Sequence, residues 1–371
     1  MMRLVLSLSG DLDPTVVERA IAEVRSARPV VLDCETGSAV VISVENLDEA
    51  QAARLDAIAG GQAHLVLPPA RLRRLGLDRQ QPGIVALPTL DPARIETLAL
   101  KVDGRVDAPV CVASALDEEA LELARLALVL PAVVVVPVAD GVEIDASILR
   151  VSGRAIADYR RAKVRDLRIV SRAPVPLEGA PVSEFVVFRG GEGLRDQVAI
   201  IVGSPDLAKP VSVRLHSACL TGDLFGSLKC DCGDQLRETV RWMAQHEGGI
   251  LLYLDQEGRG NGLSNKIRAY KLQSQGYDTY EADEVLGFEL DQRRFDFAAE
   301  MLKQLEVGVV RVMTNNPAKI EALRKAGLSV VSDQRVFGRQ TVENVRYLAS
   351  KRDKAGHYFE TDIAARAPHQ D

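Results

Sequence analysis

Hydrophobic positions over residues 1–160 follow helical and strand spacing in turn. Apolar residues that recur every three or four positions predict helices over Val16–Arg25, Asp48–Ile58 and Leu116–Leu128, with another beginning at Gly153–Tyr159. Short runs of β-branched residues predict strands over Val30–Asp33, Ala39–Val44, Ala63–Leu67 and Ala132–Val138. Helices that alternate with strands in this way indicate a mixed α/β domain.

Residues 161–182 interrupt the alternation. They are basic and polar at first, and Pro174, Pro176 and Pro181 follow. Because closely spaced prolines disfavour both helix and sheet, we expect a linker between two domains.

A second mixed α/β domain is expected over residues 183–360, followed by a short tail at 361–371. Strands are predicted over Ser183–Arg189, Gln197–Val202, Val211–His216, Ile250–Leu254, Val309–Met313 and Leu328–Val331. Helices are predicted over Cys232–Glu247, Gly262–Gln275, Arg294–Leu305 and Pro317–Lys325. The fold class expected for the whole chain is therefore α/β in two domains.

Composition narrows the classes of partner. The chain has 371 residues, 47% of them hydrophobic, and a formal net charge of −6, which does not favour nucleic acid or anionic membranes. The apolar run Leu126–Val138 contains Pro131 and is too short to span a bilayer. The first residues lack a secretory cleavage pattern, and five cysteines without regular spacing suit a reducing compartment. We therefore expect a cytoplasmic protein.

Cysteines cluster at one place in the chain. Cys219, Cys230 and Cys232 lie within fourteen residues. Thiolates are soft ligands for Zn²⁺, and three of them leave one tetrahedral position for water or substrate, as in a catalytic site. His216 could instead occupy that position and make a structural site, so the spacing leaves both alternatives open.

Two loops predict anion binding: one is rich in glycine, and the other leads into a helix that begins with proline. Gly258, Gly260 and Gly262 follow a buried strand and precede a helix, and Arg259 lies between the first two. Such a loop lets backbone N–H groups and a guanidinium approach phosphate. Thr314-Asn-Asn-Pro-Ala-Lys319 likewise joins a strand to a helix that begins with proline. Either loop alone also fits an ordinary α/β turn.

Several motifs in register resemble the GTP cyclohydrolase II family. They are Arg214-Leu-His-Ser-Ala-Cys-Leu-Thr-Gly-Asp223, Ser227-Leu-Lys-Cys-Asp-Cys-Gly-Asp-Gln-Leu236, Gln256-Glu-Gly-Arg-Gly260, Asn265-Lys-Ile-Arg-Ala-Tyr-Lys-Leu-Gln273, Gly276-Tyr-Asp-Thr279 and Met313-Thr-Asn-Asn-Pro317. The resemblance runs from about Val211 to His357. It implies a hydrolase that opens the imidazole ring of GTP at the start of riboflavin synthesis.

The resemblance also implies roles for individual residues. It makes Cys219, Cys230 and Cys232 the ligands of one Zn²⁺ per subunit. Asp291 would be the proton acceptor, Arg293 the nucleophile toward the α-phosphate, and Tyr270 an active-site tyrosine. Nucleotide contacts would come from Arg214, Leu215, His216, Ser217, Ala218, Gln235, Glu257, Gly258, Arg259, Thr279, Thr314 and Lys319. Mg²⁺ would accompany the triphosphate, and a homodimer is expected.

Three positions depart from the family pattern. Ala218 stands where the family commonly has glutamate, and Asp255 and Asn261 replace an arginine and an isoleucine around the glycine loop. These changes keep two alternatives open: a diverged cyclohydrolase for another nucleotide or base, and a non-catalytic nucleotide sensor with a structural zinc.

The N-terminal domain resembles a degenerate 3,4-dihydroxy-2-butanone 4-phosphate synthase. The similarity lies in Val17-Glu-Arg-Ala-Ile-Ala-Glu-Val-Arg25, Pro29-Val-Val-Leu-Asp33 and Ala70-Arg-Leu-Arg-Arg-Leu-Gly-Leu77. The run Asp33-Cys-Glu-Thr-Gly-Ser38 lacks most of the acidic residues with which that family binds metal. We therefore expect a non-catalytic domain.

Overall fold

The computed structural model describes residues 14–139, 141–191, 196–289, 293–339, 341 and 344. The chain divides into two compact units, which are described separately below. The first unit consists of Met1–Ala162 with two later segments, Ile267–Leu272 and Glu281–Leu290. The second unit consists of Lys163–Lys266, Gln273–Tyr280 and Asp291–Asp371. Two pieces of the expected second domain thus belong to the first unit.

In the described part of the chain, the first unit contains a seven-stranded mixed sheet with the order β5-β4-β3-β6-β2-β1-β7. Its strands are β1 (Val30–Cys34), β2 (Gly37–Ser43), β3 (His64–Leu67), β4 (Gly83–Ala86), β5 (Val110–Val112), β6 (Val133–Pro137) and β7 (Arg150–Ser152). Strands β1 and β7 are parallel, and the other neighbours are antiparallel.

Helices cover both faces of this first sheet. The helices are α1 (Pro14–Arg25), α2 (Glu49–Ala59), α3 (Pro69–Arg74), α4 (Pro92–Ala99), α5 (Ala115–Leu126) and α6 (Gly153–Arg165). Val30 and Leu32 pack in the core with α1 and α5, whereas Val31 packs in the core with α2 and α4. The sheet is buried on both faces because its side chains alternate between them.

The second unit contains another seven-stranded sheet among its described residues, with the order β14-β13-β11-β12-β10-β9-β8. Its strands are β8 (Arg168–Pro174), β9 (Ser183–Arg189), β10 (Gln197–Val202), β11 (Val211–Ser217), β12 (Gly249–Leu254), β13 (Val309–Met313) and β14 (Ser329–Gln334). The four strands β14, β13, β11 and β12 are parallel to one another, and β10, β9 and β8 continue the sheet with antiparallel pairs.

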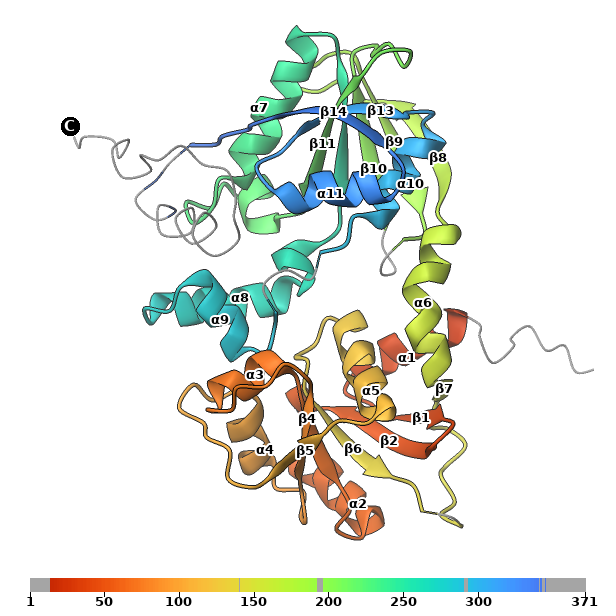
Figure 1. Cartoon of the computed structure of the whole chain (residues 1–371), viewed down its shortest axis with the longest axis vertical. Helices are drawn as coiled ribbons and strands as arrows, with labels where there is room; N and C mark the ends of the chain where they lie inside the picture. Colours follow the sequence, from red (N-terminus) through yellow and green to blue (C-terminus); the bar gives the residue numbers. More distant parts are fainter. Residues whose placement is uncertain are drawn as a thin grey trace, which may run out of the picture. The chain divides into compact units, whose positions relative to one another are not determined.

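Helix α7 (Cys232–Gln245) lies on one face of this second sheet, and α10 (Asp296–Gln304) and α11 (Pro317–Lys325) lie on the other (Figure 1). The core under α7 includes Leu251 and Met243, and the core under α10 and α11 includes Leu252 and Phe297. Helices α8 (Leu263–Ser274) and α9 (Thr279–Val285) follow β12 in the chain. Among the described helices, none is long and apolar enough to cross a membrane.

The structure confirms the mixed α/β class and all of the longer predicted elements. Sequence periodicity missed the short elements α3, α4, α9, β4, β5 and β7, because three to eight residues show too little of either period. The segment 161–182, predicted as a linker, contains the end of α6 and strand β8. This strand forms an exposed sheet edge, so its sequence lacks the apolar alternation of a buried strand. The predicted tail at 361–371 lies outside the described residues.

Candidate active site

The candidate residues gather where three parallel strands of the second sheet end. Strands β11, β12 and β13 finish at Ser217, Leu254 and Met313, and Ser217 pairs with Leu254 in register. The cysteine motif, the glycine loop and the Thr314–Lys319 loop follow these three strands directly. Ligands of open α/β sheets bind at this edge, because loops and helix starts converge beyond the carboxyl ends of the strands.

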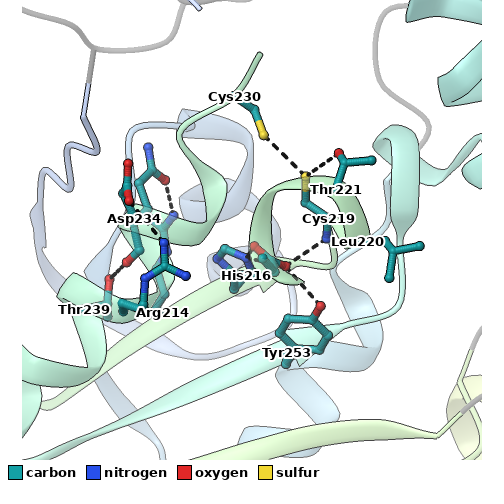
Figure 2. A network of polar contacts seen from close by, with 12 residues as sticks. Arg214, His216, Cys219, Leu220, Thr221, Cys230, Asp234, Thr239 and Tyr253 are labelled. Carbon is teal, nitrogen blue, oxygen red and sulfur yellow. Dashed lines mark hydrogen bonds and ion pairs between the residues drawn. The ribbon is translucent and has the colours of Figure 1, made fainter. Parts of the chain in front are cut away.

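Three thiols meet at this edge. The Sγ atoms of Cys219, Cys230 and Cys232 all lie within 4.8 Å of one another, and those of Cys219 and Cys230 are 3.6 Å apart (Figure 2). Gly222 lies beside them, where a Cβ would stand 2.6 Å from the Sγ of Cys230. Because real Cβ atoms do not approach so closely, only glycine leaves room for the sulfur cluster.

The donor set suits a soft metal ion. The pKa of Cys219 is lowered because Cys230 and Cys232 hydrogen-bond to its sulfur and because the Lys266 ammonium lies close by. The Nζ atom of Lys266 donates to the Sγ of Cys219 over 3.1 Å. A cluster of three thiols that already favours one thiolate fits zinc, which requires deprotonated sulfur.

His216 is held by a carboxylate. Its Nε2 lies 3.1 Å from Asp223 Oδ1, and its ring stacks on Tyr253 with centroids 5.6 Å apart (Figure 2). Asp223 also accepts from the backbone N–H of Cys219 (2.9 Å) and from the Tyr253 hydroxyl (3.0 Å). Among the described residues, the one group of three or more potential metal ligands consists of the cysteines alone. This geometry favours the alternative in which the fourth position is open.

Burial lowers the pKa of His216, although its contact with Asp223 acts in the opposite direction. The imidazole is therefore neutral at neutral pH. Asp223 and Tyr253 also border a cavity of about 470 Å³ whose other walls include Phe185, Ile200 and Val240. Arg237 and Arg241 also line this cavity, beside its apolar walls.

Arg214 contributes a buried cation from the middle of β11. Its Nη1 donates to the carbonyl of Met313 over 3.1 Å, and its Nη2 donates to Gln235 Oε1. Gln235 in turn donates to Asp231 at the start of α7. Burial lowers the pKa of Arg214 to about 10, so the guanidinium still carries its charge at neutral pH.

The glycine loop has an unusual backbone. Gly258 and Arg259 both have left-handed φ angles, of 60° and 62°. The backbone of Arg259 is strained there, since a side chain disfavours this region. Its guanidinium lies 4.3 Å from the ring centroid of Tyr280. Glu257 accepts from the backbone N–H of Leu220 (2.6 Å) and from Lys266 (2.8 Å), which joins this loop to the cysteine motif.

Further cations lie beside Phe295. The Nζ of Lys319 lies 5.5 Å from the centroid of this ring and donates to the carbonyl of Leu215 over 2.6 Å. The guanidinium of Arg293 lies 5.8 Å from the same centroid. Thr314 is buried where β13 ends. The predicted phosphate-binding residues therefore share the strand-end edge with the cysteines.

The other residues predicted for the site lie in different parts of the structure. Leu215 is buried in β11, and Ser217 and Ala218 are half-buried at its end. Thr279 begins α9 in the second unit, whereas Tyr270 lies on α8 within the first unit. Asp291 lies outside the described residues.

Sequence reasoning assigned no role to three residues that organise the site. They are Asp223, Tyr253 and Lys266. Asp223 ends the first of the family motifs, so its place in the sequence offered a signal. Lys266 is the second residue of the family motif Asn265–Gln273 and offered the same kind of signal, whereas Tyr253 resembles an ordinary strand residue.

Several buried polar atoms at this edge have no hydrogen-bond partner in the described structure. They are Arg214 Nε, His216 Nδ1, Ser217 Oγ, Gln256 Oε1 and Asn261 Oδ1. Buried polar atoms in folded proteins are nearly always satisfied, so such a group of exceptions indicates a place for a polar ligand.

Comparisons with known proteins agree with this geometry. The sequence model of the family described as GTP cyclohydrolase II matches residues 168–335. The chain is similar to GTP cyclohydrolase-2 of Xylella fastidiosa (strain Temecula1), with 42% identity over 348 residues that cover 93% of this chain and 87% of the relative. It is also similar to GTP cyclohydrolase-2 of Actinobacillus succinogenes, with 45% identity over 190 residues, or 51% of this chain and 87% of the relative.

A solved structure is also similar in outline. It is RibBX, a two-domain 3,4-dihydroxy-2-butanone 4-phosphate synthase from A. baumannii. The match covers 87% of this chain and 99% of that one, with 15% identity and a TM-score of 0.32.

Proposed function

Because the chain belongs to the GTP cyclohydrolase II family, we propose that it is a zinc-dependent enzyme that hydrolyses GTP in riboflavin synthesis. The proposed products are 2,5-diamino-6-hydroxy-4-(5-phosphoribosylamino)pyrimidine, formate and pyrophosphate. The observation that carries the proposal is the strand-end edge of the second sheet, where three clustered thiols accompany buried polar atoms that lack partners.

Cys219, Cys230 and Cys232 would hold the zinc ion. When bound, zinc supplies a Lewis acid that activates water for attack on the purine ring. Asp223 contributes by fixing the backbone of Cys219 and the ring of His216. The neutral His216 leaves its Nδ1 available for a substrate or water proton.

The cations at the edge would bind the triphosphate. Arg214 and Lys319 are held by backbone carbonyls, so they are oriented before substrate arrives. Preorganised cations stabilise charge that develops when pyrophosphate leaves. Arg259 and the N–H groups of the glycine loop would add contacts, and Mg²⁺ would enter on the phosphates. Gln235, Glu257, Thr279 and Thr314 complete the proposed nucleotide contacts.

Arg293, Asp291 and Tyr270 retain their proposed catalytic roles. An arginine nucleophile must lose a proton from a group whose pKa exceeds about 12. Asp291 would accept that proton at the α-phosphate. Arg293 and Lys319 both lie near the Phe295 ring, with the guanidinium 5.8 Å and the ammonium 5.5 Å from its centroid. The enzyme is proposed to act as a homodimer.

The N-terminal region is proposed to lack synthase activity. Asp33, the acid near the end of β1, accepts a hydrogen bond from Ser38 (2.6 Å). Its two carboxylate oxygens also accept hydrogen bonds from the Arg150 guanidinium. Cys34 donates to Glu119 over 2.9 Å. Carboxylates already committed to protein partners are poor candidates for Mg²⁺ ligands.

The test is release of formate and pyrophosphate from GTP by the full chain, with GDP and ATP as parallel substrates. Turnover with GTP that stops on zinc chelation and returns with added Zn²⁺ is the expected result. Preference for another nucleotide would favour the diverged cyclohydrolase that Ala218 and Asp255 suggest. Nucleotide binding without any product would favour the sensor.

A further inference from the structure

Arg71 in the first unit is a buried cation with an uncommon set of partners. It is 1% exposed and lies on α3. Its guanidinium donates to four backbone carbonyls, those of Leu98 (2.7 Å), Lys101 (2.7 Å), Thr97 (3.0 Å) and Val285 (3.0 Å). The first three belong to the last turn of α4 or follow it, whereas Val285 is the last residue of α9.

This arrangement has a clear physical basis. The last carbonyls of a helix lack intrahelical partners and carry partial negative charge, so a cation stabilises them. One arginine thus caps the ends of two helices that are far apart in the sequence. Arginine suits this position because its planar fork offers five N–H donors, whereas lysine offers three donors at one point.

An ion pair also fixes α8, which precedes α9 in the chain. The later segment below means the stretches 267–272 and 281–289 of the first unit. Arg268 on α8 contacts both carboxylate oxygens of Glu45, over 2.7 and 3.1 Å. The Glu45 carboxylate also accepts from the backbone N–H of Leu130 over 2.6 Å, which holds it in place. Arg73 contacts Glu284 (3.4 Å) and Glu289 (3.1 Å) around Arg71.

Packing supports the same attachment. Gly287 has a φ of +84°, and a Cβ there would lie 3.1 Å from Pro68 and 3.3 Å from Pro131. The backbone of the later segment therefore touches the N-terminal region as closely as glycine allows. Val285, Leu286 and Phe288 are buried at 0%, 2% and 3% exposure.

We propose that the N-terminal region acts as a platform that binds and orders two later stretches of its own unit, 267–272 and 281–289, with Arg71 and Glu45 as positioning residues for cyclohydrolase activity. This inference rests on the proposed function, because that function assigns a catalytic role to Tyr270, two residues after Arg268. A region without synthase activity would then serve to hold a part of the cyclohydrolase sequence in one conformation.

The variants that test this platform are Arg71→Met, Glu45→Gln and Arg268→Gln in the full chain. Glu45→Gln keeps an acceptor for Leu130 and removes only the charge. Arg94→Gln is the matched control, because it breaks a comparable pair with Asp107 (2.7 Å) that does not involve the later segment.

The first measurement is amide hydrogen exchange of peptides from 267–272 and 281–289. Removal of Arg71 leaves buried carbonyls unsatisfied, so we expect exchange there to accelerate by about tenfold or more, with smaller changes for Glu45→Gln and Arg268→Gln. Arg94→Gln should leave these peptides unchanged. Unchanged exchange in all three variants would overturn the proposal, whether or not the protein hydrolyses GTP.

The second measurement is turnover of GTP at saturating zinc. We expect kcat to fall by about fivefold to a hundredfold in the three variants, with zinc content unchanged, because small displacements of a catalytic segment are costly. A double-mutant cycle of Glu45→Gln and Arg268→Gln should be non-additive. Faster exchange with unchanged kcat would contradict the positioning role. Absence of formate from the wild-type chain would instead reject the proposed function and leave the exchange result intact.

Discussion

Among the described residues, the two units differ in where buried polar atoms without hydrogen-bond partners lie: Tyr159 Oη lies within the core of the first unit, whereas several such atoms gather at the strand-end edge of the second unit. In the first unit, Arg71 and Asp117 are buried with partners of their own unit, four carbonyls for the arginine and His64 and Ser114 for the aspartate. In the second unit, buried groups such as Arg214 and His216 leave nitrogen atoms without partners beside three thiols. Buried polar groups that have all their hydrogen bonds stabilise a fold, whereas buried polar groups without partners at a sheet edge indicate a ligand site.

The largest effect should come from the thiol cluster. Cys230→Ser removes one of three zinc ligands, so we expect turnover of GTP to fall by at least about a thousandfold and bound zinc to fall from about one per chain toward zero. Metal analysis and formate release measure both. The matched control is Cys111→Ser, which changes an exposed cysteine of the first unit and should alter neither. Full activity of the Cys230 variant would remove zinc from the mechanism.

A smaller but still large effect is expected at Arg214. Arg214→Met should lower kcat/KM for GTP by about a hundredfold to a thousandfold, because a preoriented cation at the phosphates is lost. Steady-state kinetics with GTP give the value. Arg237→Met, on the outer part of α7, serves as control and should change kcat/KM less than about twofold. Equal losses in both variants would argue that Arg214 acts only through the stability of the unit.

In the second unit, burial of His216 should make stability depend on pH. His216 has a lowered pKa in the folded protein because of burial, whereas the unfolded chain binds a proton near about 6.5. Its contribution to stability is therefore complete above that pH and is lost as pH falls below it. Denaturant unfolding between about pH 5 and 8 should show a steeper loss for the wild type than for His216→Gln. Parallel curves would show that His216 is not responsible.

The smallest effect is expected from an exposed pair in the first unit. The hydrogen bond from Arg94 lowers the pKa of Asp107, so its contribution is present above the unfolded pKa and is lost as pH falls through the folded value. Because Asp107 is about half exposed, solvent screening limits the contribution of the pair to about 1 kcal/mol or less. Asp107→Asn should change the unfolding free energy by no more than that and leave turnover unchanged. A larger loss would contradict the view that solvent screening limits this pair.

The sequence predicted most of what depends on local pattern. Runs such as Val133–Pro137 and the amphipathic α7 were recognisable because burial imposes their period. The cysteine cluster was recognisable because three potential metal ligands lie close in the chain. Ser217 and Thr314, in contrast, were brought to one edge by the order of the parallel strands, which no local pattern contains.

Long-range polar contacts were beyond such reasoning. Arg71 lies in a run that carried the resemblance to the synthase, and no local pattern indicated its burial. It is buried where carbonyls of α4, of Lys101 and of α9 meet its guanidinium. Lys266 likewise gains its significance from Cys219, which is 47 residues away in the chain. Charge on a helix becomes structural or functional only through partners that the tertiary fold supplies.

X-ray absorption at the zinc edge, on the full chain with and without GTP, tests whether three thiolates hold zinc and leave its fourth position open. We expect three sulfur ligands at about 2.3 Å and one lighter ligand whose signal changes when nucleotide binds. A fourth ligand with the scattering pattern of imidazole, unchanged by GTP, would show that His216 closes the site and would contradict the proposed hydrolysis.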